Sequence, residues 1–406
     1  MTAATTYRAL LRTPGAAAFF VPTALGRIGI AMTSLSIVWL VRAATGSYAT
    51  AGLVTGAFAV ADALAGPQVG RLIDRFGQNR VLPSAVAAHA VAVAALVLSA
   101  VNDAPGWLLA IAGALVGASL PQLSAVALAR WSALLDGERR ATLPSAYALE
   151  SLSNSVAYLV GPALVSTIAA AGRPVLGTLS AAALVVAGGS VLALQRRTAP
   201  PVAARDGGHA HHRRALLRPG FVVLVGVNTA IGGFFGTMSI AVTAFAVERD
   251  TPELAAVLFA ASNAAGILAV LVYGLSRWRT DPRRQLAGAA SALGLGSLPL
   301  LAGGSPAEVM AGVVAGVLLT AVAVPVVLVL GSVLADAVVD RGVLTEAFAW
   351  LGSASAAGSA VAATVAGLAV DGSGARGGLL VAVVAAGATA TLALAGLRML
   401  RPADQP

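Results

Sequence analysis

The chain contains twelve apolar stretches, each long enough to cross the hydrocarbon core of a membrane. A helix needs about 20 apolar residues for that crossing. Isolated strands cannot span a bilayer, and these stretches are too long and too uniform for the alternating pattern of a membrane barrel. The sequence therefore predicts an all-α membrane protein with twelve transmembrane helices. We place them at about 16–41, 49–69, 81–101, 107–129, 145–171, 175–194, 219–247, 254–275, 286–303, 307–333, 344–370 and 378–397.

Composition excludes several classes of soluble protein. Of the 406 residues, 58% are hydrophobic and 11% are charged, whereas soluble domains carry roughly 25% charged residues. There is no cysteine, which excludes disulfides and thiol chemistry. Phosphate-binding glycine loops, metal-hydrolase motifs and nucleophile elbows are absent from the sequence. We therefore expect a protein that is not an enzyme and that uses no cofactor.

The basic residues predict the orientation of the chain in the membrane. All 26 are arginine, and they concentrate in the short connectors. With both termini inside the cell, 21 arginines face the cytoplasm, four face outside, and Arg27 lies within the first stretch. This asymmetry follows the positive-inside rule, so the net charge of +9 indicates a lipid bilayer as partner and not nucleic acid. We expect a multi-pass protein of the inner (plasma) membrane, with both termini cytoplasmic.

The first stretch has the basic flank of a signal peptide, with Arg8 and Arg12 before it. It is too long for a signal peptide, however, and Arg27 interrupts the position of the apolar region. We therefore interpret it as a first transmembrane helix.

A polar connector divides the chain into two halves. We predict six-helix bundles at 1–194 and 219–406, joined by a cytoplasmic linker at 195–218 that holds six arginines. Residues 45–49 before the second stretch correspond to residues 250–254 before the eighth, which indicates an internal repeat. Two similar halves are typical of transporters whose substrate site lies between the repeats, near the middle of the membrane.

The linker also contains three closely spaced histidines. His209, His211 and His212 are a residue type that binds transition metals. They have no cysteine partner and lie on a flexible segment, so we predict no metal site there.

The connector after the second stretch carries the most specific motif. Residues 70–80 read GRLIDRFGQNR, with Gly70, Asp74, Arg75, Gly77 and Arg80 at the positions that define it. This closely resembles the Gly-x-x-x-Asp-Arg-x-Gly signature of the major facilitator superfamily, although Gln78 and Asn79 stand where the family often has basic residues. The resemblance implies a twelve-helix fold with N-in and C-in termini, and a secondary transporter of small molecules.

Physical chemistry gives these residues roles in a conformational latch. Glycine permits a tight turn and a close approach of helices. A carboxylate such as Asp74 accepts hydrogen bonds at the N-terminus of a facing helix. Arg75 and Arg80 are expected to pair with carboxylates of the other half, for which Asp336 and Asp340 are candidates. The alternative is that these charges only fix the topology.

Three ionisable residues lie within the predicted helices. Arg27, Asp62 and Glu150 all belong to the first half, and charges at membrane depth are costly enough to be functional by default. Burial favours a protonated carboxyl group and a nearby arginine favours the charged one, so such a cluster can couple protonation to conformation. The alternative is a static ion pair that holds the helices together.

The fifth stretch adds two weaker indications. Residues 147–151, read with Gly161 and Pro162, are similar to a group of actinobacterial members of the superfamily. The Gly-Pro pair also matches the core of a longer drug/proton antiporter motif, whose flanking glycines are missing here. A simple proline kink is the alternative.

Polar and aromatic residues within the helices are the candidates for a substrate cavity. With few charges in the second half, we expect a mostly apolar or amphipathic substrate, and Gly232 to Gly236 indicate a flexible gate in the seventh helix. The candidates are Asn154, Tyr158, Asn228, Phe234, Phe235, Asn263 and Trp350.

Together these features predict a proton-coupled antiporter, active as a monomer, for efflux of a small-molecule substrate. Two alternatives stay open: a proton-coupled importer of a metabolite, and a non-transporting membrane protein, such as a sensor or lipid scramblase, that keeps the fold.

Overall fold

The computed structural model describes residues 3–202, 216–276, 278 and 280–400, and every regular element among them is a helix. The all-α fold expected from the sequence is thereby confirmed. The chain forms two compact units, which we describe separately. The first comprises Met1–Ala146, Ser153–Asp206 and Arg341–Ser353, and the second comprises Tyr147–Leu152, Gly207–Asp340 and Ala354–Pro406. The boundaries of the two predicted halves, at residues 194 and 219, remain a prediction. The compact units differ from these halves at two short segments, since Tyr147–Leu152 belongs to the second unit and Arg341–Ser353 to the first.

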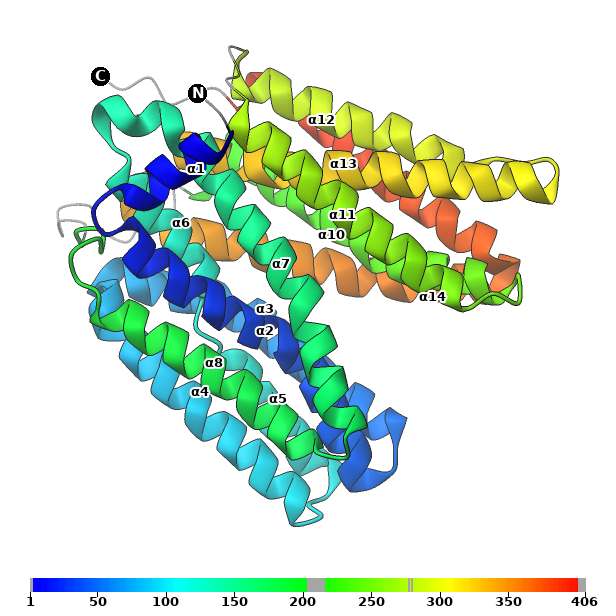
Figure 1. Ribbon diagram of the computed structural model, residues 1–406, viewed down its shortest axis with the longest axis horizontal. Helices are drawn as coiled ribbons and strands as arrows, with labels where there is room; N and C mark the ends of the chain where they lie inside the picture. The colour runs from blue at the N-terminus through cyan, green and yellow to red at the C-terminus, as the bar shows by residue number, and fades with distance from the viewer. Residues whose placement is uncertain (1–2, 203–215, 277, 279, 401–406) are drawn as a thin grey trace. The chain divides into compact units, whose positions relative to one another are not determined.

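The helices of the chain up to residue 194 follow one another through short turns (Figure 1). They are α1 Ala3–Arg12, α2 Ala16–Thr45, α3 Tyr48–Phe76, α4 Gln78–Val101, α5 Gly106–Ala118, α6 Leu123–Leu134, the 3-10 helix η1 Gly137–Thr142, α7 Leu143–Ala170 and α8 Pro174–Leu194. Helix α1 was not expected. It ends at Arg12, and Gly15 (φ 90°) then turns the chain into α2.

The rest of the chain also consists of helices joined by short connectors. Its elements are α10 Pro219–Val247, α11 Glu253–Leu275, α12 Pro282–Ser297, η2 Leu298–Leu301, α13 Pro306–Val338, η3 Arg341–Val343, α14 Leu344–Ala395 and η4 Gly396–Arg398.

Twelve membrane helices are present, with corrections to three of them. Ten helical segments have the length and hydropathy of a membrane span. One of these, Arg341–Arg398, consists of two helices, because the backbone at Ser373 and Gly374 is not helical. Helix α12 with η2 adds the remaining span, although α12 itself has only 16 residues. The predicted fourth helix, 107–129, is in fact broken into α5 and α6 around Pro121, whose ring nitrogen cannot donate a helical hydrogen bond.

Apolar residues from four helices form the core of the first unit. Ile37, Val54, Leu96 and Leu109, from α2 to α5, are fully buried in one cluster. Helices α3 and α5 approach so closely that a Cβ atom at Gly117 would lie 2.1 Å from the carbonyl oxygen of Phe58. Such small-residue contacts are how helices pack where lipid removes the hydrophobic driving force.

Glycines have a similar packing role in the second unit. A Cβ atom at Gly232 would lie 1.9 Å from the carbonyl oxygen of Ser355, and one at Gly236 would lie 2.2 Å from that of Ser359. Helix α10 runs through both glycines without interruption. These glycines therefore do not form the predicted flexible gate. They allow the backbones of α10 and α14 to pack closely against each other.

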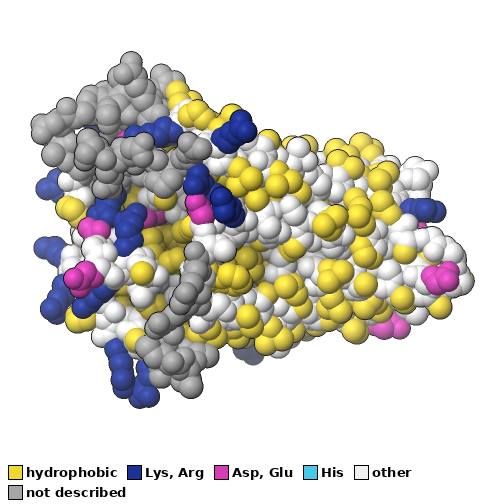
Figure 2. Space-filling model, turned by 90° about the horizontal axis from the view of Figure 1, so that it is seen from above, with side chains coloured by type: hydrophobic (Ala, Val, Ile, Leu, Met, Phe, Trp, Pro, Cys, Tyr) yellow, Lys and Arg dark blue, Asp and Glu magenta, His cyan; other side chains and the backbone are white. Residues whose placement is uncertain are grey.

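The surface has the character of a membrane protein. Large apolar side chains such as Leu64, Leu268 and Leu368 are more than 60% exposed, which in water would be an aggregation-prone surface. On the face shown in Figure 2, hydrophobic side chains cover the lengths of the helices and most of the arginines gather at one end. This chain is a multi-pass integral membrane protein.

Candidate functional site

The motif at residues 70–80 forms the end of α3, a one-residue turn and the start of α4. Gly77 makes this turn with φ 87° and ψ 147°, a backbone conformation that side-chain-bearing residues rarely adopt. Its backbone N–H donates to the carbonyl of Ile73 at 2.8 Å and closes α3. The glycine is thus required by local geometry, as the sequence indicated.

Asp74 caps the N-terminus of α14. Its Oδ1 accepts a hydrogen bond from the backbone N–H of Thr345 at 3.2 Å, and its Oδ2 accepts one from that of Glu346 at 2.8 Å. Both donors lie in the first turn of α14, where backbone N–H groups have no partner within the helix. A negative charge at this end of a helix is stabilised by the aligned peptide dipoles.

Gly70 and Arg71 complete the contact with α14. A Cβ atom at Gly70 would lie 2.8 Å from the Cα of Glu346, so only glycine permits this approach. Arg71 donates to Oε1 of Glu346 from Nε at 3.1 Å and from Nη2 at 2.7 Å. The carboxylate of Glu346 is only 1% exposed, which makes this a partly buried ion pair.

A second ion pair lies close by. The guanidinium of Arg341 donates from Nη1 and Nη2 to the two carboxylate oxygens of Asp136, both at 2.6 Å. These hydrogen bonds hold the pKa of Asp136 well below its usual range. A pocket of about 480 Å³ is lined by residues of both contacts, including Asp74, Asp136, Arg341 and Thr345.

The arginine partners expected from the sequence differ from those observed. Arg75 stacks over the ring of Phe76 at 5.1 Å, and among the described residues neither Arg75 nor Arg80 forms an ion pair. Asp340 pairs with Arg218 at 3.1 Å within the second unit. Sequence reasoning missed Arg71, although it precedes Asp74 by three residues and therefore shares its helix face.

Gln78, which departs from the family pattern, belongs to a buried polar network. Its Oε1 accepts a hydrogen bond at 2.7 Å from Nε of Arg130, a side chain with no solvent exposure. The other guanidinium nitrogens of Arg130 donate to Gln195 Oε1 at 2.6 Å, Thr198 Oγ1 at 3.2 Å and the carbonyl of Leu192 at 2.9 Å. The sequence placed Arg130 in an exposed connector, but α6 continues to Leu134 and buries it.

The break between α5 and α6 brings polar groups to the intramembrane charges of the first unit. Arg27 is 3% exposed, and its Nε donates to Ser124 Oγ at 3.0 Å. Nε2 of Gln122 lies 3.4 Å from Oδ1 of Asp62. Asp62 lies halfway along α3, 14 residues from either end.

The third predicted charge is also buried. Glu150, on α7, is 3% exposed and belongs to the segment Tyr147–Leu152 of the second unit. Within the first unit, the structure brings Arg27 to Ser124 and Asp62 to Gln122, two partners that sequence reasoning missed. Pro121 is the sequence signal for the helix break that places these two partners.

The predicted cavity residues divide by exposure. Asn228 is 6% exposed and donates to the carbonyl of Leu224 in its own helix at 2.9 Å, and Phe234 is 4% exposed. The remaining candidates keep exposed side chains: Asn154, Tyr158, Phe235, Asn263 and Trp350.

The predicted linker histidines at 209, 211 and 212 lie outside the described residues. Within the described part of the chain, no group of three His, Cys, Asp or Glu side chains is arranged to hold a metal ion.

Comparisons with known proteins agree with the fold. A comparison with curated proteins gives no match. The structure is similar to that of a bacterial homologue of the iron transporter ferroportin, solved in an outward-facing state, with a TM-score of 0.76, 12% identity, and coverage of 93% of this chain and 98% of that chain. It is also similar to the E. coli fucose:proton symporter (TM-score 0.71, 15% identity, 95% of this chain and 100% of that chain).

A third similar structure is a human organic anion transporter, with a TM-score of 0.65, 16% identity, and coverage of 95% of this chain and 98% of that chain. These likenesses show that the twelve membrane helices are arranged in the same fold as in those transporters. The sequence profile of the Major Facilitator Superfamily matches residues 19–343. The chain belongs to the Major Facilitator Superfamily.

Proposed function

We propose that this chain is a secondary active transporter that exports a small apolar or amphipathic compound in exchange for protons. It works by alternating access, as a monomer in the plasma membrane. The observation that supports alternating access best is the contact of Asp74 with the N-terminus of α14.

This contact has the properties of a latch. It consists of a few polar interactions over the close approach of α3 to α14 at Gly70. The ion pairs Arg71–Glu346 and Asp136–Arg341 act on the same segment, Arg341–Ser353. Polar contacts of this size are each worth about 0.3–2 kcal/mol, so substrate binding energy is enough to form or release them.

Proton coupling is supported by the charges within the membrane helices of the first unit. Arg27 is buried and donates to Ser124, and the partly exposed Asp62 accepts from Gln122, two residues before Ser124, at the break between α5 and α6. Burial favours a neutral carboxyl group, while a nearby guanidinium favours the charged one. A carboxyl group held between these influences changes its protonation when the surrounding helices move.

An apolar or amphipathic substrate is supported by the second half of the chain. Among the described residues between Pro219 and Ala395, acidic residues and arginines alike lie near helix ends or in connectors, and none lies in the middle of a span. Exposed aromatic side chains, such as Phe235 and Trp350, offer apolar contact area instead. A sugar phosphate or dicarboxylate would require more charge than these helices provide.

The orientation is tested by labelling single cysteines, which is clean because the chain has none. We expect membrane-impermeant reagents to label Asn102→Cys and Gly372→Cys from outside intact cells. Glu138→Cys and Arg196→Cys should react only after the cells are opened. Labelling of Arg196→Cys in intact cells overturns the N-in, C-in orientation.

Asp74→Asn tests the latch. The substitution keeps the shape of the side chain but removes the charge that meets the helix dipole. We expect the docked state to lose about 1–2 kcal/mol, which is roughly a five- to thirtyfold change in its population. A cysteine at Leu344, which is 3% exposed, should then be labelled correspondingly faster, and transport should fall.

The matched control is Asp103→Asn, the same chemical change at an exposed carboxylate in the turn between α4 and α5. Exposed substitutions away from a contact change stability little, so labelling and transport should stay near those of the parent. If the two substitutions have equal effects, or if Asp74→Asn is fully active, the motif is not a latch and its charges only fix the membrane topology.

A further inference from the structure

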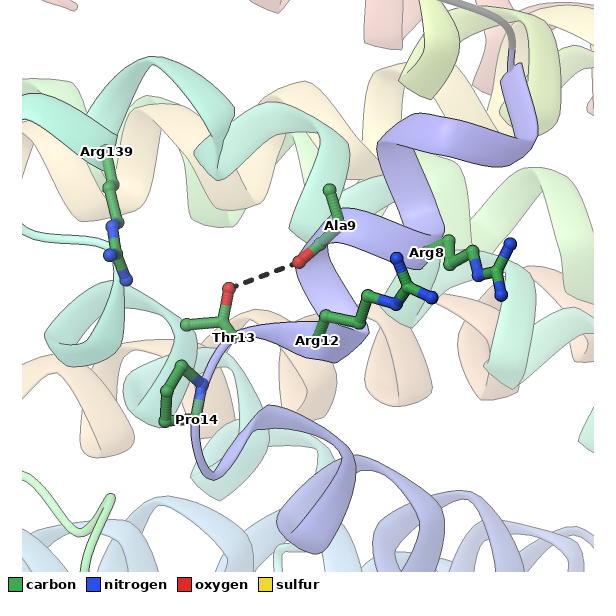
Figure 3. Close-up of a pocket in the computed structure, with 6 residues that line it drawn as sticks. All are labelled: Arg8, Ala9, Arg12, Thr13, Pro14 and Arg139. Carbon is green, nitrogen blue, oxygen red and sulfur yellow. Dashed lines mark hydrogen bonds between the residues drawn. The ribbon is translucent and has the colours of Figure 1, made fainter.

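A basic pocket lies where the amino-terminal helix meets the connector before α7. It has a volume of about 520 Å³ and is lined by Arg8, Ala9, Arg12, Thr13, Pro14 and Arg139. Arg8 and Arg12 are one turn apart on α1 and share a face, while Arg139 comes from η1. Figure 3 shows Arg8 and Arg12 side by side and Arg139 on the other side of Thr13.

The charge of this pocket is not balanced by the described residues. No acidic side chain lines it, and none of its three arginines forms an ion pair with another residue in the described ranges. The nearby carboxylate of Asp136 is engaged by Arg341. Arg8 and Arg12 thus place two positive charges one turn apart, with Arg139 across the pocket, and a guanidinium group matches the geometry of phosphate oxygens.

The surroundings of the pocket are those of a membrane interface. Helix α1 packs Leu10 against the protein, at 4% exposure, while Arg8 and Arg12 stay exposed. The transmembrane helix α2 begins two residues after Pro14. Ala17, Val21 and Leu25 then follow at four-residue spacing, and all three are exposed, which gives an apolar strip that starts next to the pocket.

A basic hollow above an exposed apolar strip has the shape of a phospholipid. We propose that Arg8, Arg12 and Arg139 bind the phosphate headgroup of an anionic phospholipid, whose acyl chains lie along α2. A soluble phosphate compound would use the same guanidinium groups but would gain nothing from the apolar strip. Lipid binding would anchor α1 and the connector before α7 to the same leaflet, and it does not depend on what the protein transports.

The experiment uses the full-length protein in nanodiscs of phosphatidylcholine to which phosphatidylglycerol is added. Binding is measured from the fluorescence of a labelled phosphatidylglycerol and from lipid retained in native mass spectrometry. We expect Arg8→Gln/Arg12→Gln/Arg139→Gln to weaken binding about fivefold for each arginine, or roughly a hundredfold in total. Binding by the parent should weaken as salt is added.

The control is Arg196→Gln/Arg197→Gln/Arg398→Gln, which removes the same charge at exposed arginines outside the pocket. This variant should bind within a few-fold of the parent. The single variant Arg139→Gln, which changes an exposed side chain outside α1, provides a second measurement if the triple variant is poorly folded, and it should lose about fivefold.

Two outcomes overturn the proposal. One is an equal loss in the pocket and control variants, since that makes binding a property of net charge. The other is displacement of the labelled lipid by inorganic phosphate or glycerol phosphate at similar concentrations, because the site then belongs to a soluble anion.

Discussion

Replacing Arg27 by alanine is expected to abolish proton-driven transport while the protein still inserts into the membrane and folds. Arg27 is the cation of the buried group in the first unit, with 3% exposure and a hydrogen bond to Ser124. Without it, carboxylates at membrane depth lose a nearby positive charge and take up protons, because a neutral acid costs less there than a bare charge. Protonation then no longer changes with conformation. The measurement is dye accumulation in vesicles under an imposed pH gradient.

A double variant separates coupling from structure. Arg27→Ala/Asp62→Asn should recover thermal stability but not coupling, because it removes the charge that was left uncompensated. The control is Arg42→Ala in the same helix, where the guanidinium stacks over Tyr48 near the helix end; it should transport like the parent. If a double variant drives transport against a gradient as the parent does, the charges are only scaffolding.

Arg130→Ala is expected to cause the largest loss of stability, about 3–5 kcal/mol, the usual consequence of breaking a buried charged network. The substitution removes one hydrogen-bond donor from each of Gln78, Gln195, Thr198 and the carbonyl of Leu192, and it opens a cavity among them. Thermal unfolding of the purified protein in detergent measures the effect. Arg130→Lys should be intermediate, because an ammonium group cannot reach all four acceptors.

The control for Arg130→Ala is Arg196→Ala, an exposed arginine whose loss should change stability by less than about 0.5 kcal/mol. A similar small change in Arg130→Ala is incompatible with the network described here.

Much of the fold was predictable because lipid imposes strong constraints on sequence. A helix that crosses the membrane must be long and apolar, so the twelve helices could be located from hydropathy alone. The roles of Asp74 and Gly77 were also accessible, since a helix-end carboxylate and a turn glycine each follow from local chemistry. The structure places both as expected, with Asp74 at the start of α14 and Gly77 at φ 87°.

The remaining features depend on tertiary contacts that hydropathy does not record. Pro121 interrupts an apolar stretch whose hydropathy is that of a single helix. The sequence does not distinguish Arg130 from an arginine in a connector, because hydropathy does not show that α6 continues beyond it. Glycines such as Gly232 and Gly236 occur both in flexible segments and at tight helix crossings. Here the close position of Ser355 identifies a tight helix crossing. Which arginine reaches Glu346 depends on the rotation of α3, which a short motif does not specify.

Proton-coupled export is tested most directly by an experiment on the unmodified chain. Inverted vesicles that contain the protein are given a pH gradient, acidic inside, and a panel of fluorescent amphipathic dyes and labelled metabolites. We predict that at least one amphipathic compound accumulates in the lumen, that its accumulation alkalinises the lumen, and that a protonophore abolishes both. Accumulation that is unchanged by the protonophore, or proton movement in the same direction as the substrate, contradicts proton-coupled export.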